Sequence, residues 1–193
     1  MRFLKKYLLW CALFLSTSCE PITLYFQGQK PAQIQIKGKT MYLNGVLGRV
    51  SSQRIKKALK NNPAIDTLVI VRSDGSVYDE FNIEIAKELH KKGMVTRLLP
   101  FSKIASGAVD LFLAGKTRII PKGAKIGVHS WKNRAGEAKN LPLTHQGHNL
   151  FLDYYKEIGI DTSFYWYTVN IAAYKDIHWL NDEEIERFQL RKE

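Results

Sequence analysis

The stretch IDTLVIVRSDGSVYDEFNIEIAKELHKKGMVTRLL, residues 65–99, decides the fold class of this chain. It opens with a mostly apolar, β-branched run over 65–71, which is typical of a strand buried on both faces of a parallel sheet. A turn around Gly75 leads into apolar residues at helical spacing, and Gly93 closes the predicted helix. Residues 95–99 predict a second strand. Strand, helix and strand in this order indicate a right-handed crossover between parallel strands.

The same alternation continues on both sides of this stretch. Upstream, the pattern predicts two strands that turn at Gly38 and a helix that begins near Ser51 and Ser52. Downstream, a largely apolar helix begins at Ser106 and two short strands follow it. The sequence therefore predicts an α/β fold of repeated ββα units, with a mainly parallel sheet covered by helices and a helical C-terminal part. The predicted strands are 33–36, 41–43, 65–71, 95–99, 117–120 and 126–129, and the predicted C-terminal helices are 144–158, 161–173 and 181–189.

The first residues have the pattern of an export signal. Arg2, Lys5 and Lys6 precede an apolar run over 7–15 that is too short to cross a bilayer comfortably. One globular domain is expected after this leader, because the chain has 193 residues and 45% apolar content. The expected segments are a signal peptide over 1–18, a tether over 19–32 and the domain over 33–193.

Cys19 ends a segment, LSTSC, that is similar to a bacterial lipoprotein signal. In such signals the cysteine carries lipid and becomes the first residue of the mature chain. We therefore expect Cys19 to anchor the domain in the bacterial cell envelope, in the periplasm. The alternative is an ordinary signal peptide with an incidental cysteine.

Charge and cysteine content restrict the function classes. The formal net charge is +11, and the positive residues are scattered along the chain without an aromatic-interleaved basic stripe. This pattern favours attraction to an anionic lipid or envelope surface over nucleic-acid binding. The two cysteines, Cys11 and Cys19, lie in the leader, so the domain has no disulfide, thiolate nucleophile or cysteine metal site.

Three motifs carry the candidate chemistry. They are SDGSV (73–77), a glycine-containing turn after a buried strand; IASGA (104–108), which opens the next helix; and IGVHS (126–130), with a histidine at a strand end. A serine hydroxyl needs a base to remove its proton, so Ser106 is the candidate nucleophile and His129 the candidate base. The developing oxyanion needs fixed donors, which the amide of Gly107 and that of Gly75 or Ser76 are placed to supply.

In order and spacing, these motifs resemble those of the Clp-protease and crotonase superfamily, and more closely its periplasmic, serine-protease-like members, over residues 33–190. Family motifs of the type Ser-Pro-Gly-Gly-Ser-Val, Ala-Ser-x-Gly and an apolar strand ending in His match the three segments in turn. The resemblance implies the fold and a serine-hydrolase reaction. The chain departs from the first motif, where Asp74 replaces the proline and one glycine is missing, which puts the oxyanion-hole geometry in question.

The resemblance also suggests a third catalytic residue. In the Clp proteases the catalytic acid precedes a short helix, and NDEEI (181–185) occupies that place here, with Asp176 just before it. Asp176 is therefore the candidate orienting acid, although the register fits only with a one-residue insertion. Asp161 is the second choice.

Each of these residues also has a purely structural interpretation. Ser106 can be a helix N-cap, and His129 a histidine satisfied at a strand end. His145 and His148, three residues apart, are more typical of an exposed polar helix start than of a metal site, because no third ligand accompanies them.

The leading hypothesis is an envelope serine hydrolase acting on peptide or protein, without cofactor or metal. The alternative is a catalytically inactive domain that keeps the fold for assembly or partner binding. Acyl-CoA chemistry is disfavoured because an exported protein meets little CoA. Since relatives form rings or stacked trimers, a homo-oligomer is also expected, with internal packing of the same rings as the alternative. The rings expected at the subunit contact are Phe164, Tyr165, Trp166, Tyr167 and Trp179.

Overall fold

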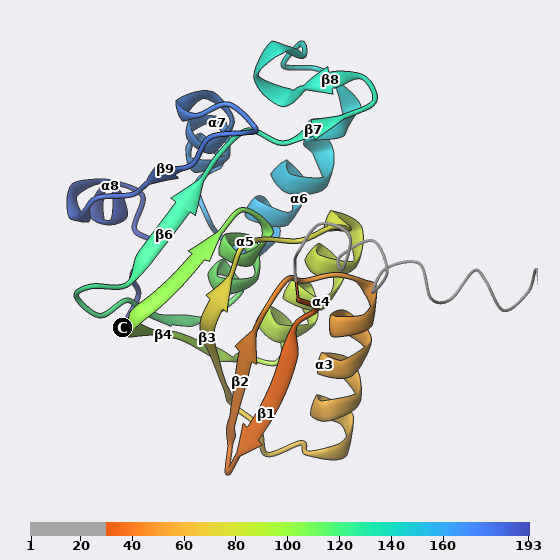
Figure 1. The fold of residues 1–193 in the computed structure, drawn as a ribbon, viewed down its shortest axis with the longest axis vertical. Coiled ribbons are helices and arrows are strands. Elements are labelled where there is room, and N and C mark those ends of the chain that lie inside the picture. Colours follow the sequence, from red (N-terminus) through yellow and green to blue (C-terminus); the bar gives the residue numbers. More distant parts are fainter. Residues whose placement is uncertain (1–29) are drawn as a thin grey trace, which may run out of the picture.

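The computed structural model describes residues 30–193, so the expected signal peptide, most of the tether and Cys19 lie outside the described residues. One sheet organises the chain, with the strand order β1-β2-β3-β4-β6-β9 and β5 paired to β4 (Figure 1). Its strands are β1 (Gln33–Lys37), β2 (Thr40–Asn44), β3 (Thr67–Ser73), β4 (Val95–Ala105), β5 (Thr117–Ile119), β6 (Lys125–Val128) and β9 (His178–Trp179). The predicted α/β class is confirmed: strands β2 to β6 pair in parallel, and β1 and β9 add antiparallel edges.

Strand β4 is longer than the sequence predicts, because it continues through Pro100. Its first part, at Val95 to Arg97, pairs with β5, and its last part, at Lys103 to Ala105, pairs with β6. Proline has no N–H to donate, and it interrupts a strand without ending it when the flanking residues pair with different partners. Strand β4 therefore pairs with β5 through its first residues and with β6 through its last residues.

The register brings the three motifs to one edge of the sheet. Ser73 pairs with Ile104 across β3 and β4, and Ala105 pairs with Gly127 across β4 and β6. The amide of Ser106 continues the second ladder by donating to the Gly127 carbonyl at 3.1 Å. Since these strands are parallel, the turn after β3, the start of the helix after β4 and the histidine after β6 lie side by side.

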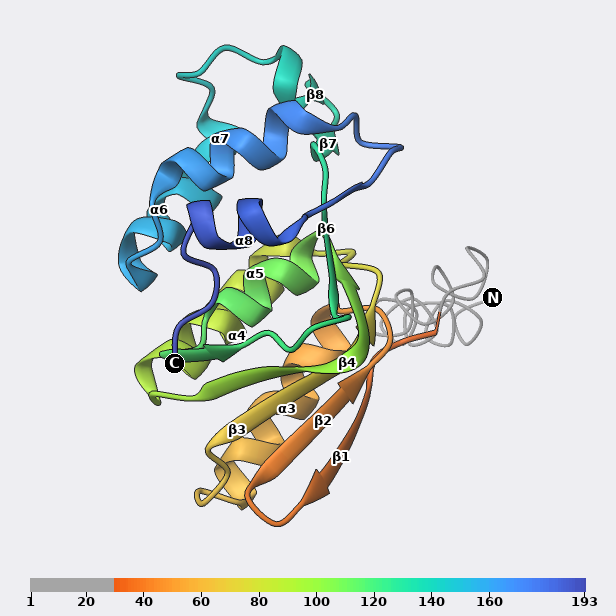
Figure 2. The same ribbon diagram turned by 90° about the vertical axis from the view of Figure 1, so that its left-hand side faces the viewer.

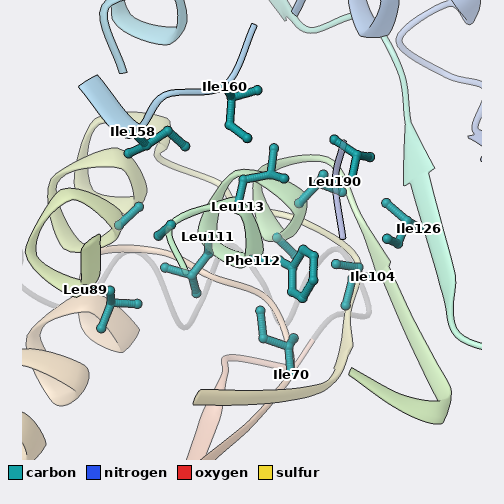
Figure 3. Close-up of a cluster of buried hydrophobic side chains, with 14 of the residues drawn as sticks. Ile70, Leu89, Ile104, Leu111, Phe112, Leu113, Ile126, Ile158, Ile160 and Leu190 are labelled. Atoms are coloured by element: carbon teal, nitrogen blue, oxygen red, sulfur yellow. The ribbon is translucent and has the colours of Figure 1, made fainter. Parts of the chain in front are cut away.

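Three helices cover one face of the sheet: α3 (Arg49–Asn61), α4 (Asp79–Lys91) and α5 (Gly107–Leu113). Every residue of α5 is buried, as its apolar sequence predicts. Figure 3 shows Leu111, Phe112 and Leu113 of this helix within the core, with Ile104 and Ile126 of the sheet beside them. Helix α5 is thus held on all sides, and its first residue is fixed by the core.

Elements β7, β8, α6 and α7 of the C-terminal third lie at the end of the molecule toward which β3 and β6 run, whereas the C-terminus returns toward β5 (Figures 1 and 2). Helix α6 begins later than predicted, because residues 146–148 form a 3₁₀ turn before it. The segment 133–142, which carries no readable motif, contributes to a small hairpin and a second 3₁₀ turn. The elements here are β7 (Lys132–Asn133), β8 (Gly136–Glu137), η1 (Ala138–Asn140), η2 (Gln146–His148), α6 (Asn149–Ile158), α7 (Thr162–Ile171) and α8 (Asp182–Arg187).

The aromatic residues of α7 pack mainly inside the chain. Phe164 and Tyr165 are buried in the core, so the expectation that these two rings form a subunit contact is wrong. Trp166 and Tyr167 are partly buried against the same core, and Trp179 is half-buried on β9. Helical geometry explains the division, since four consecutive residues point in different directions around a helix. Oligomerisation itself stays a prediction.

Arg118 on β5 is buried with 5% of its surface exposed. Its guanidinium donates to three backbone carbonyls: Nε to Leu190 at 2.7 Å, Nη2 to Gln189 at 2.9 Å and Nη1 to Gly115 at 3.2 Å. The backbone of Arg118 also exchanges two hydrogen bonds with Lys192. This cluster, the Arg118 clasp, fastens residues 189–192 to the edge of the sheet.

No helix within residues 30–193 is long and apolar enough to cross a membrane.

Candidate active site

The glycine turn after β3 packs directly against the turn that follows β4. A Cβ added at Gly75 would lie 2.9 Å from the Cβ of Ser106, and one added at Gly107 would lie 2.1 Å from the Oγ of Ser76. Real side chains do not approach so closely, so both positions require glycine in the present arrangement. Each glycine therefore packs against a serine side chain of the other turn, as the register of the sheet demands.

Ser106 has a backbone conformation that side chains seldom adopt. It connects β4 to α5 without any intervening loop, with φ 52° and ψ −136°. In serine hydrolases of other folds, a strained strand-to-helix turn raises the nucleophilic hydroxyl clear of the sheet. The structural interpretation of Ser106 as an N-cap is not supported, because its side chain forms no capping hydrogen bond.

The amides of Gly75 and Gly107 are not used by the fold. Neither amide donates a hydrogen bond to another group among the described residues. The peptide after Gly107 is fixed from the other side, since Asn82 on α4 is fully buried and donates from Nδ2 to the Gly107 carbonyl at 2.7 Å. The turn at Ser106 and Gly107 is thus held in place while the amides of Gly75 and Gly107 stay free for a ligand.

His129 follows β6 and is half-buried. Its Nδ1 lies 2.8 Å from the carbonyl oxygen of Ser130. A carbonyl oxygen only accepts hydrogen bonds, so Nδ1 carries the proton and donates, and Nε2 of the neutral ring has the free lone pair. The backbone therefore orients the imidazole with its basic nitrogen defined.

Ser106, Gly107 and His129 line one pocket with a free volume of about 40 Å³. No hydrogen bond joins the Ser106 hydroxyl to His129 within residues 30–193. Three rings of the pocket wall are stacked: Phe151 lies between Trp131 and Tyr165, with interplanar angles of 21° and 15°. The remaining lining residues are Asp79, Val109, Asp110, Val128, Tyr155 and Thr168.

Asp79 opens α4 and brings a carboxyl group into this pocket. Burial raises its pKa, and a hydrogen bond from the Ser76 hydroxyl lowers it in part. Glu80 raises the pKa slightly, while His129 lowers it. Asp79 therefore interacts electrostatically with His129.

Asp110, on the first turn of α5, brings a second carboxyl group into the pocket. Its Oδ1 accepts a hydrogen bond from the Tyr155 hydroxyl at 2.8 Å, and its Oδ2 has no partner among the described residues. The pKa of Asp110 is raised from 3.8 to about 8, chiefly by burial; the hydrogen bond from Tyr155 lowers it in part, and the charge of Asp79 raises it. Asp110 is therefore protonated at neutral pH.

The candidate acids from the sequence do not reach this site. Asp176 is exposed in the segment between α7 and β9 and does not line the pocket. Asp161 is the N-cap of α7, where its Oδ1 accepts from the amide of Ser163 at 2.7 Å. The position that Asp176 was expected to fill, at Nδ1 of His129, is occupied by the Ser130 carbonyl.

His148 is also placed differently from its expectation. It is fully buried, not an exposed helix start, and its Nδ1 lies 2.6 Å from the Tyr165 hydroxyl. That hydroxyl accepts from the Trp131 indole N–H at 2.9 Å, so His148 supports two residues of the pocket wall. His145 instead accepts a hydrogen bond from the amide of Gly147. No group of three histidine, cysteine or carboxylate side chains suited to a metal occurs within residues 30–193.

Sequence reasoning identified Ser106, Gly107 and His129 but missed Asp79 and Asp110. The signal for Asp110 is present in the sequence, because it is the one charged residue in an otherwise apolar helix that follows the candidate nucleophile. A charge within a buried helix needs a partner or a function. Asp79 has no comparable signal, since acidic residues are common in the first turn of helices.

Comparison with known proteins supports the fold and leaves the site open. No family model and no curated protein matches the sequence. Among solved structures, the chain is similar to a probable enoyl-CoA hydratase from Mycobacterium tuberculosis, at 12% identity and a TM-score of 0.52, over 84% of this chain and 73% of the other. A probable enoyl-CoA hydratase/isomerase from Mycobacterium abscessus matches at 11% identity and a TM-score of 0.47, over 83% and 67%. With the mainly parallel sheet and the turns described above, the first match confirms the predicted fold: the chain has the α/β architecture of the crotonase superfamily.

Proposed function

We propose that this protein is a serine hydrolase that cleaves a peptide or a related acyl compound. The observation that carries the proposal is the meeting of Ser106, Gly107 and His129 at one pocket, with Gly75 packed against Ser106. Strain at Ser106 and unused amides beside it are features that a merely structural turn does not need. Both features lie where a nucleophile and an oxyanion hole are required.

In the proposed reaction, Nε2 of His129 takes the proton of the Ser106 hydroxyl as Oγ attacks the substrate carbonyl carbon. The resulting oxyanion accepts hydrogen bonds from the amides of Gly75 and Gly107. The bond to the leaving group then breaks, and His129 returns its proton to the leaving nitrogen or oxygen. Water repeats the sequence on the acyl-enzyme and releases the acid.

Asp79 replaces Asp176 in this proposal as the acid that assists His129. It does so through charge and not by holding Nδ1, because Nδ1 is bonded to the Ser130 carbonyl. The imidazolium that forms during the reaction is stabilised by a nearby carboxylate. The arrangement is a serine–histidine pair oriented by the backbone and assisted by Asp79.

A fluorophosphonate probe tests the proposal, since it reacts covalently with an activated serine. We expect labelling of the folded protein, no labelling of Ser106→Ala, and labelling at least about a hundredfold slower in His129→Ala. Ser163→Ala, which changes an exposed serine of α7, is the matched control and should label normally. Failure of the folded protein to label, under conditions that label a known serine hydrolase, would favour the non-catalytic alternative.

We further propose that the enzyme is held in the bacterial envelope by lipid on Cys19. The basic charge of the chain supports this placement, because it favours an anionic lipid surface. Changing Cys19→Ser should release the protein from the membrane fraction and alter its mature mass. An unchanged membrane fraction and mass would contradict the anchor.

A further inference from the structure

The candidate pocket differs from the protein around it in its ionisable residues. The chain has 29 lysine and arginine residues against 18 aspartate and glutamate residues. None of the pocket-lining residues is a lysine or an arginine, whereas two of them, Asp79 and Asp110, are acids. Within residues 30–193 neither acid forms an ion pair. In a basic protein, the acids of this site thus lack the counter-charge that is plentiful elsewhere.

Asp110 is the acid that most needs a partner. Asp110 is 8% exposed, and Tyr155 donates a hydrogen bond to only one of its two carboxyl oxygens. A buried carboxylate without a cation is costly, so in the empty pocket the group keeps its proton. A bound cation removes that cost, because it supplies the missing charge and a donor for Oδ2.

The rest of the pocket wall is aromatic. Trp131, Phe151 and Tyr165 form a stack, and Tyr155 closes the wall beside Asp110. The faces of aromatic rings attract cations, and an aromatic wall combined with an acid is a common chemistry for binding ammonium groups. The free volume of about 40 Å³ admits only a small group, since one water needs roughly 10–15 Å³ on this scale.

We propose that this pocket binds a primary ammonium group of the substrate, carried on a short aliphatic stem, between Asp110, Asp79 and the aromatic wall. As a substrate site, the proposal rests on the hydrolase function proposed above. It names the substrate class of that site as an acyl compound with an amine close to the scissile bond. The amine is either the α-ammonium of a peptide or the ε-ammonium of a lysine.

Binding is measured without turnover, on Ser106→Ala protein, with n-propylammonium as the probe and n-propanol as its uncharged counterpart. The Trp131 indole N–H, which is bonded to Tyr165, provides an NMR signal at the pocket wall. We expect the amine to shift this signal and to bind at least about tenfold more tightly than the alcohol. Equal binding of amine and alcohol would overturn the proposal.

Asp110→Asn tests the acid while keeping its shape and its hydrogen bond from Tyr155. Affinity for n-propylammonium should fall at least about tenfold, and Asp153→Asn, at an exposed position on α6, should leave it unchanged. Unchanged affinity in Asp110→Asn would overturn the proposal. If that variant does not fold, the pH dependence of the Ser106→Ala protein decides: amine binding should strengthen between pH 6 and 9 as the proton of Asp110 is released, and a flat profile would contradict the site.

Competition identifies the source of the amine. Alaninamide presents an α-ammonium and Nα-acetyl-lysinamide an ε-ammonium, so displacement of n-propylammonium by one of them assigns the substrate. Displacement by neither would overturn the assignment to peptide substrates. Probe labelling of Ser106 is measured without amine and amine binding without turnover, so failure of the hydrolase and failure of the ammonium site are distinguishable.

Discussion

Two buried ionisable groups lie at opposite ends of helix α5, Asp110 within its first turn and Arg118 beyond its last, and they differ in how fully they are hydrogen-bonded. Arg118 lies beyond the C-terminal end of α5, and all three nitrogens of its guanidinium donate to carbonyls. Asp110 lies near the N-terminal end of α5, with one oxygen bonded to Tyr155 and the other facing the pocket. A buried charge whose nitrogens all have partners holds a fold together, whereas one left incomplete marks a place for a ligand. The predictions below test this difference.

Removing the Arg118 clasp should have the largest effect on stability. Arg118→Met leaves three carbonyls without their donor, and we expect the free energy of unfolding to fall by about 3 kcal/mol or more. Urea unfolding measures this. Arg97→Met, at an exposed position on β4, is the control and should change stability by less than about 0.5 kcal/mol. Equal losses in the two variants would remove the distinction between the clasp and an ordinary surface arginine.

Asp110→Asn should have an effect of opposite sign that depends on pH. The pKa of Asp110 is raised from 3.8 to about 8, so its protonated form favours folding. That contribution is present below pH 3.8 and is lost as pH rises toward 8. Asp110→Asn should therefore be more stable than the parent at pH 8 and similar to it at pH 4.

Urea unfolding across this pH range measures the difference. Asp153→Asn is the matched control and should follow the pH profile of the parent protein. An Asp110→Asn profile parallel to that of the parent would show that the carboxyl is not buried as described.

Protonation of His148 should lower the stability of the folded protein at acid pH. Burial lowers its pKa below 6.5, the Pro142 carbonyl partly offsets this, and His145 lowers the pKa slightly further. Among the described residues, Nε2 of His148 has no hydrogen-bond partner. The folded state therefore resists protonation, and stability should decline as pH falls below 6.5. His148→Gln should flatten this decline, whereas His145→Gln should keep it. Thermal unfolding between pH 5 and 7.5 measures both.

The smallest effect is expected from an exposed charge. Lys56 on α3 bridges Glu84 and Glu88 on α4 at 2.6 and 2.9 Å, and these two partners raise its pKa. Exposed ion pairs contribute little, so Lys56→Ala should cost about 0.5–1 kcal/mol, and less in high salt. A loss as large as that of Arg118→Met, measured in the same urea series, would contradict the ranking by burial.

The frame of the fold was predictable because it depends on periodic patterns. The apolar run before Gly75 and the helix before Gly93 specify a crossover, and parallel pairing then brings Gly75 and His129 to the same edge. The extension of β4 through Pro100 was not predictable, because it depends on two partner strands that meet it at different points.

The candidate site was predictable only in part. Ser106 and His129 stand in motifs, whereas Asp110 acquires its properties from Tyr155, which is 45 residues away in the sequence. Asp176 was chosen for its place before a short helix, and the backbone of Ser130 instead orients His129. Phe164 and Tyr165 were expected at a subunit contact, but both are buried inside the chain. The sequence of an aromatic helix does not show which of its faces packs against the core of its own chain.

The Arg118 clasp also sets the order in which the molecule can be completed during synthesis. A nascent chain that extends only to α7 already contains Arg118 and the helix it adjoins, but not the carbonyls of Gln189 and Leu190. Burial of the guanidinium at that stage would leave most of its donors unmet, so the edge of the sheet stays open until those residues emerge. Proteolysis of arrested nascent chains of increasing length should show protection of β5 only after Leu190 has left the ribosome.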